Sequence, residues 1–95
     1  MTETEHLLAC LAEECAEVAQ RADKAQRFGL DEVQPGQSLS NGIRIFGELM
    51  DLFAVMELLI ARGSLPQCLD RPAIEMKKGK VEHFMEYARG RGTLT

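Results

Sequence analysis

The chain has 95 residues, a formal net charge of −4 and a hydrophobic fraction of 45 %. This length fits a single domain over residues 1–95, and so short a chain buries only about 60 to 65 % of its unfolded surface, so a second chain is expected to complete the core. The acidic balance argues against binding of a nucleic acid polymer, which requires a dense basic surface.

The sequence gives no indication of a membrane protein. No apolar run approaches the roughly 20 residues of a membrane span. The first ten residues, MTETEHLLAC, lack the basic start of a secretory signal. A cytoplasmic location is therefore expected.

Cysteine usage indicates neither a zinc site nor a disulfide framework. Cys10, Cys15 and Cys68 are odd in number and lack the paired short spacings of zinc ligands. All three are expected to be small buried thiols.

The first predicted element is a long amphipathic helix from about Thr4 to Phe28. Its apolar stripe recurs at helical spacing and consists of Leu7, Leu11, Cys15, Val18, Ala22 and Ala25. Glu14 and Glu17 lie three residues apart at the edge of this stripe. The helix thus carries two carboxylates beside its apolar face.

A loop is predicted next, because the segment GLDEVQPGQSLSNG combines glycine, proline, serine and asparagine. Ser40 is expected to cap a second helix that runs to about Arg62, and Gly63 suits a left-handed C-terminal cap. The second helix is apolar around most of its circumference, which is typical of a helix buried on several sides. Glu48 and Asp51 interrupt this apolar surface, so they are expected to lie inside the assembly.

The rest of the chain is also predicted to be helical. Pro66 fits the start of a short helical turn, and Pro72 fits the first position of a final helix that ends near Gly90. No strand-like alternation is present. The expected fold is all-α: a helical bundle of two long antiparallel helices plus a helical C-terminal segment, completed by self-association.

The two acid pairs have two interpretations. In the first, they belong to ordinary helical ion pairs, Glu17 with Arg21 and Arg44 with Glu48, each worth about 0.2 to 0.5 kcal/mol. Glu14 and Asp51, however, have no basic residue one turn away. In the second interpretation, the antiparallel helices bring all four carboxylates together.

Such a cluster requires compensation. Two like charges about 6 Å apart at an effective dielectric constant near 20 repel by about 3 kcal/mol, and four carboxylates form six such pairs. The sum rivals the whole stability of a small domain. Protonation or a cation must relieve it, and dense oxygen ligands suit magnesium or manganese rather than zinc.

The arrangement EECAE, a loop, then ELMD inside an apolar helix resembles the E-x-x-E and E-x-x-D signature of the MazG-like, all-α nucleoside triphosphate pyrophosphohydrolases. The resemblance implies a magnesium-dependent enzyme that cleaves a nucleotide between its α and β phosphates, releasing a monophosphate and pyrophosphate. It also implies a homodimer or homotetramer. By motif position, Glu14, Glu17, Glu48 and Asp51 are the implied catalytic residues and metal ligands.

Basic residues are expected to hold the phosphates, since the chain lacks a G-x-x-x-x-G-K-[ST] loop. The resembled family often places phosphate-contacting bases on a helix after E-x-x-D, which favours Lys77 and Lys80, three residues apart. A solvated basic face is the alternative for these two lysines. Arg21, Lys24 and Arg44, near the acid pairs, compete for the same role.

Two other functions remain open. Phosphoribosyl-ATP pyrophosphohydrolase, from the same superfamily, uses similar carboxylates, and only a substrate panel separates it from an enzyme that acts on the nucleotide pool. From a different class, the chain fits a noncatalytic helical interaction module, which predicts no metal dependence.

Overall fold

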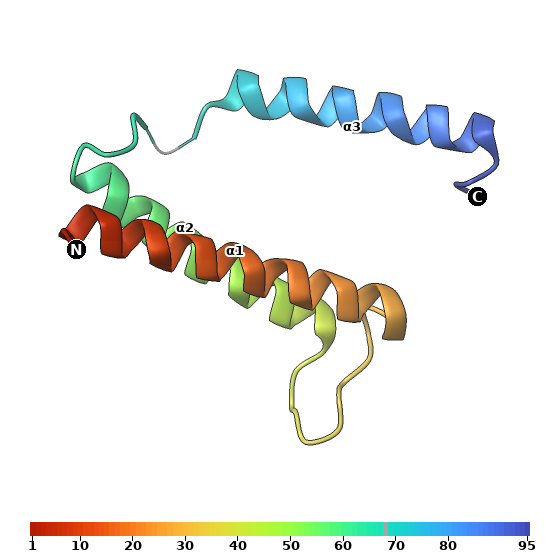
Figure 1. Ribbon diagram of the computed structural model, residues 1–95. Coiled ribbons are helices and arrows are strands. Elements are labelled where there is room, and N and C mark those ends of the chain that lie inside the picture. Colours follow the sequence, from red (N-terminus) through yellow and green to blue (C-terminus); the bar gives the residue numbers. More distant parts are fainter. Residues whose placement is uncertain (68) are drawn as a thin grey trace.

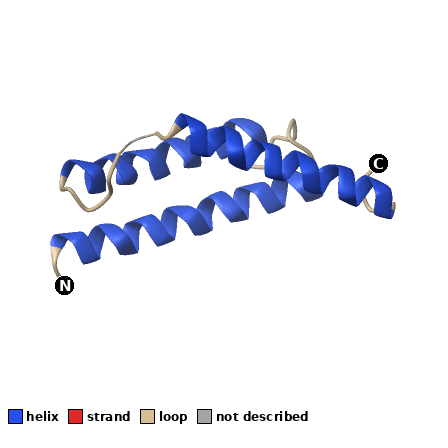
Figure 2. Ribbon diagram, turned by 90° about the horizontal axis from the view of Figure 1, so that it is seen from above, coloured by secondary structure: helices blue, strands red, loops and turns tan. Residues whose placement is uncertain are grey.

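The computed structural model describes residues 1–67 and 69–95, and its regular secondary structure is entirely helical. The helices are α1 (Glu3–Phe28), α2 (Asn41–Ala61) and α3 (Arg71–Arg91) (Figures 1 and 2). The all-α prediction is confirmed, and each long helix begins and ends within about two residues of the predicted position.

Local hydrogen bonds explain where α1 and α2 begin. The Thr2 hydroxyl accepts from the Glu5 amide at 3.1 Å, and the Thr2 amide donates to Glu5 Oε2 at 3.0 Å. This reciprocal capping box satisfies two amides that the first turn leaves unpaired. Ser40 caps α2 as predicted, because its hydroxyl accepts from the Ile43 amide at 3.3 Å.

The end of α2 also follows the prediction. Gly63 adopts a φ of 75°, and its amide donates to the carbonyl of Ile60 at 2.9 Å. The Ser64 amide donates to the carbonyl of Leu59, also at 2.9 Å. This pair of bonds is a Schellman motif, which requires a left-handed residue after the helix and so favours glycine. Residues 62–66 form turns and bends, and the described residues 67, 69 and 70 are not helical, so the helical turn expected from Pro66 is absent from the described residues.

The loop between α1 and α2 is closed by hydrogen bonds around Asn41. Asn41 is 1 % exposed, and its Nδ2 donates to the Gly29 carbonyl at 2.8 Å and to Glu32 Oε1 at 2.9 Å. The Asn41 amide donates to the Glu32 carbonyl at 2.9 Å. An isolated antiparallel bridge joins Val33 to Ser40. The loop therefore fixes how α2 returns beside α1.

Contacts near both ends show that α1 and α2 lie side by side in opposite directions (Figure 1). At one end, Asn41 reaches Gly29. At the other, Arg62 Nε lies 3.6 Å from Glu3 Oε2. The bundle completed by a second copy stays a prediction.

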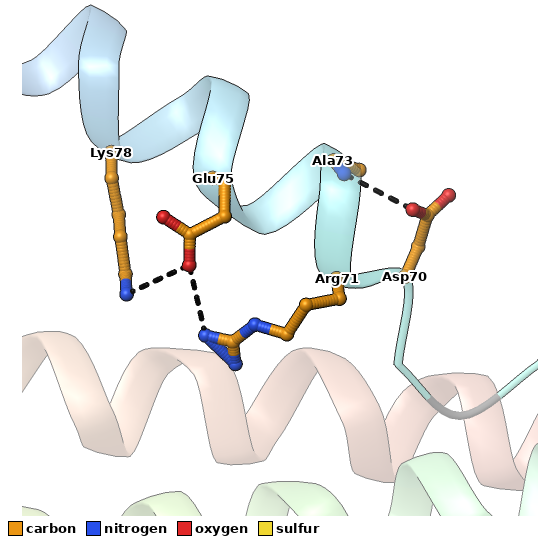
Figure 3. Close-up of polar contacts among 5 residues, drawn as sticks. All are labelled: Asp70, Arg71, Ala73, Glu75 and Lys78. Atoms are coloured by element: carbon orange, nitrogen blue, oxygen red, sulfur yellow. Dashed lines mark hydrogen bonds and ion pairs between the residues drawn. The ribbon is translucent and has the colours of Figure 1, made fainter.

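Helix α3 is stabilised by contacts within its own sequence. The Asp70 carboxylate accepts from the Ala73 amide at 3.0 Å, and Pro72 lies in the first turn, where its missing amide hydrogen needs no partner. Glu75 Oε1 lies 3.1 Å from Arg71 Nη2 and 3.2 Å from Lys78 Nζ (Figure 3). Among the described residues, α3 makes no contact with α1 or α2.

The single chain has almost no buried core. Within residues 1–67 and 69–95, only Ala25, Asn41 and Leu59 are buried. The radius of gyration is 16.6 Å, whereas a compact domain of this length has about 12 Å. No described helix is long and apolar enough to cross a membrane.

The expectation of buried thiols was wrong for Cys15, which is exposed. Cys10 is half-buried. Cys68 lies outside the described residues. Cys15 is exposed because α1 turns a different face toward α2 than its apolar residues alone indicate, as the burial along the helix shows.

Candidate functional site

A single seam runs between α1 and α2, along the faces that the two helices shield from solvent. On each helix its residues recur at alternating intervals of three and four, the spacing at which helices interlock side chains. The α1–α2 seam comprises Leu7, Leu11, Glu14, Val18, Arg21 and Ala25 of α1 with Asn41, Ile45, Glu48, Leu52, Val55 and Leu59 of α2, all half-buried or buried.

The polar residues of the seam occupy positions where apolar side chains normally pack. Glu14 lies between Leu11 and Val18 in the seam order, not at its edge as the sequence indicated. Glu48 takes the corresponding place on α2. The exposed Cys15 shows why the prediction missed this placement. It rested on the apolar residues, whereas the observed face follows a strict three-and-four spacing that includes charged residues.

Three of the four predicted carboxylates come together across the seam. One oxygen from each of Glu14, Glu17 and Glu48 lies within 4.8 Å of the others, and all three side chains are half-buried. Like charges at this separation repel by about 3 kcal/mol per pair at an effective dielectric constant near 20, before further screening by solvent. Acidic groups are common without a metal, so the cluster alone identifies no ion.

Buried atoms without hydrogen-bond partners also lie in the seam. They are Glu14 Oε2, Glu48 Oε2 and Arg21 Nη1. Leaving such a group unpaired costs about 1 to 3 kcal/mol, and more when it is charged. The two oxygens suit a cation or a proton donor, whereas the guanidinium nitrogen suits an anion. The seam thus holds unpaired groups suited to a cation and an unpaired group suited to an anion.

The simple ion-pair interpretation of the acids is not supported in the described part of the chain. Glu17 forms no ion pair with Arg21, and Glu48 forms none with Arg44. Instead, Arg44 Nη1 donates to Gln34 Oε1 at 3.1 Å. The carboxylates therefore face one another without a direct basic partner.

The electrostatic consequence appears at Glu48. Its pKa is raised from the ordinary 4.5, first because the neighbouring Glu17 side chain favours the protonated form through a hydrogen bond, and then because of burial. The charges of Glu17 and Asp51 raise the pKa further, and Arg21 opposes them. A proton at this carboxyl group therefore relieves part of the repulsion.

Asp51 is not part of this three-oxygen group. It follows Glu48 by three residues on α2, is exposed in the single chain, and acts on Glu48 through its charge. The exposed side chain does not fit the expectation of an interior position within one copy. A fourth ligand from Asp51 requires its side chain to turn toward the seam.

The predicted phosphate-binding residues lie in different places. Lys24 and Arg44 are half-buried beside the seam. Lys77 and Lys80 are exposed on α3, away from the acid cluster in one chain. Neither lysine belongs to an ion pair within the described residues, in contrast to Lys78, which pairs with Glu75.

Arg21 is the residue whose position the apolar pattern did not reveal. It was one of several bases near the acid pairs, but it lies in the seam itself, with one guanidinium nitrogen buried. Its interval of seven residues from Glu14 is the sequence signal that places both on one face. A cation thus lies on the same seam as the carboxylates.

Comparison of the chain with protein-family models, with curated proteins and with solved structures finds no match.

Proposed function

We propose that the protein is a magnesium-dependent nucleotide pyrophosphohydrolase of the MazG-like type, which cleaves a nucleoside triphosphate to a monophosphate and pyrophosphate. The observation that carries the proposal is the convergence of Glu14, Glu17 and Glu48 across the α1–α2 seam. Two of these carboxylates leave a buried oxygen unpaired. Oxygen ligands of this kind fit magnesium, with manganese as an alternative ion.

In this proposal the carboxylates hold the ion, and Asp51 completes the set from the next turn of α2. When bound, the ion neutralises phosphate oxygens and orients the attacking water. The half-buried position of the acids keeps part of the water away from the reacting phosphates and strengthens the local field. The raised pKa of Glu48 follows from the same crowding of negative charge that a bound cation relieves.

The basic residues divide into two groups by distance from the acids. Arg21, Lys24 and Arg44 lie in or beside the seam and are placed to meet phosphate oxygens. Lys77 and Lys80 lie on α3 and take part only if α3, or α3 of another copy, covers the seam. The functional unit is a homodimer or homotetramer, because one chain leaves most of its apolar side chains exposed.

The experiment that tests the proposal incubates the protein with a panel of nucleotides and magnesium and separates pyrophosphate from orthophosphate. The panel contains canonical and modified nucleoside triphosphates and phosphoribosyl-ATP. We expect pyrophosphate and a monophosphate from at least one of them, and no turnover in chelator. Glu48→Gln is the inactive control. Orthophosphate with a diphosphate nucleotide as the product would contradict the bond assignment.

A noncatalytic interaction module is the second candidate, and the exposed apolar side chains of α2 and α3 favour it. Under this alternative the acid cluster regulates stability without a metal. No turnover across the whole panel, together with unchanged thermal stability on addition of magnesium, would support the module instead of the enzyme.

A further inference from the structure

Helix α2 carries a second apolar stripe on the face opposite the α1–α2 seam. It comprises Ile43, Phe46, Met50 and Phe53, again at intervals of three and four residues. Their exposed fractions are 55, 61, 39 and 40 %. At about 100° per residue, the centre of this outer stripe lies about 160° from the centre of the seam. One face of α2 is covered by α1, and the other has no partner among residues 1–67 and 69–95 of the same chain.

The four residues of the outer stripe carry no charge, and Glu57, four residues after Phe53, begins the charged end of the same face. Arg44, Glu48 and Asp51 all point at least about 120° away from its centre. A contiguous apolar patch of several large side chains is unusual on a monomeric protein and marks an interaction surface. We therefore expect another molecule to cover this face in the assembled protein.

The total surface supports a macromolecular partner. The accessible surface of the chain is 7199 Å², whereas a compact protein of 10.6 kDa exposes about 5,500 Å². The excess of about 1,700 Å² is larger than the roughly 800 Å² that each partner buries in a standard interface. This excess belongs to the whole chain, including α3, which stands apart from α1 and α2, and it is large enough for an interface of standard size.

The shape of the stripe favours a copy of itself as the partner. Gly47 and Ala54 flank the large side chains, and the space beside Gly47 is open, with no atom within 4 Å of a Cβ built there. Two identical stripes brought together by a twofold axis place phenylalanine side chains of one against the small residues of the other. Each copy then supplies both the protruding and the receiving surface.

We propose that the outer stripe of α2 is the dimer interface, packing against α2 of a second copy. The protein then has four central helices, with the two α2 helices in the middle and an acid cluster on each side. The proposal rests on the self-association that is part of the proposed function, but it does not depend on the nucleotide hydrolysis. The two are tested separately, because the interface is measured by molecular mass and the activity by product.

Analytical ultracentrifugation at micromolar concentration tests this surface with Met50→Glu, near the middle of the stripe. We expect a wild-type dimer, or a tetramer built from it, and a dissociation constant raised on the order of 100-fold or more in the variant. Leu58→Glu is the matched control, because Leu58 is 47 % exposed on the same helix but lies off the stripe. It should leave the mass unchanged.

A second variant decides the case in which Met50→Glu also unfolds the chain. Met50→Lys is made separately and mixed with Met50→Glu, because opposite charges at facing stripes restore pairing only between unlike copies. Return of the dimer mass and of helical circular dichroism on mixing supports the interface. No recovery, equal dissociation by Leu58→Glu, or a wild-type monomer would overturn it.

Discussion

Glu17 of α1 faces Glu48 of α2 across the seam, and this contact is the leading reason that the pKa of Glu48 is raised. Both belong to the group of three carboxylates whose oxygens lie within 4.8 Å of one another. The helix pair thus brings together groups that repel each other when ionised. The repulsion between these carboxylates lowers the stability of the fold, and such a cost is typical of a ligand-binding site.

The raised pKa predicts a pH dependence of stability in chelator. A carboxyl group whose pKa is raised on folding binds more protons in the folded state. Its stabilising contribution is complete below its ordinary pKa of 4.5 and is lost as the pH rises through the raised value of the folded state. The free energy of unfolding from denaturant titrations at constant protein concentration should therefore fall with pH across this window.

Glu48→Gln should remove this contribution to the slope and stabilise the metal-free protein near neutral pH. The gain is a fraction of the roughly 3 kcal/mol of each screened repulsion. Glu82→Gln is the control, because Glu82 is exposed on α3, outside both the acid cluster and the outer stripe. Equal slopes for the wild type and Glu48→Gln would show that Glu48 does not control this dependence.

Asn41→Ala tests the closure of the loop independently of the site. The change removes the bonds from Nδ2 to the Gly29 carbonyl and to Glu32 in a buried environment. We expect a loss of about 1 to 3 kcal/mol in the free energy of unfolding. Ser38→Ala, in the exposed part of the loop, should change it by less than about 0.5 kcal/mol. An equal effect of the two substitutions would contradict the structural role of Asn41.

Much of the fold was predictable from the sequence, because periodicity and capping residues act locally. Ser40 and Gly63 mark the two ends of α2 correctly. The hydrogen bonds of Asn41 were not predictable, since they depend on how the loop returns over a distance in sequence. Apolar character alone predicts a buried Cys15, whereas the face that α1 turns toward α2 includes Glu14 and Arg21 among its apolar residues.

The candidate site was predictable in part for the same reason. Two E-x-x-[ED] pairs on neighbouring antiparallel helices predict an encounter of carboxylates, and Glu14, Glu17 and Glu48 meet. Asp51 does not join them, because its side chain points to a different side of α2 and is exposed in the single chain. This direction depends on how α2 is rotated about its own axis, which the sequence pattern does not fix. The apolar pattern does not distinguish Arg21 from Lys24 and Arg44, because the interval of seven residues from Glu14 is informative only once Glu14 is known to lie in the seam.

Asp51→Asn separates a ligand role from a structural one. If Asp51 completes the metal site, activity at fixed magnesium should fall by about 100-fold or more, and magnesium should raise the melting temperature less than in the wild type. In chelator the exposed change should alter stability by less than about 0.5 kcal/mol. Thermal melts with and without magnesium provide the comparison. A variant that keeps full activity would remove Asp51 from the site.

Lys77→Ala and Lys80→Ala test whether α3 contributes to substrate binding. Loss of a charge-assisted hydrogen bond to phosphate should raise KM about tenfold or more for each lysine. Lys78→Ala is the matched control, because Lys78 is held by Glu75. Steady-state kinetics with the preferred nucleotide give the answer. Three equal KM values would leave Lys77 and Lys80 as part of a solvated basic face.

Binding of manganese, followed by electron paramagnetic resonance of the free ion, is the most direct test of the acid cluster because it requires no substrate. Wild-type protein should remove Mn²⁺ from solution in a saturable manner, and magnesium should compete for the same sites. Glu17→Gln and Glu48→Gln should each weaken binding by about 10-fold or more, and Glu13→Gln, an exposed neighbour on α1, should not. Absence of saturable binding by the wild type, or equal binding by all variants, would contradict a metal site in the α1–α2 seam.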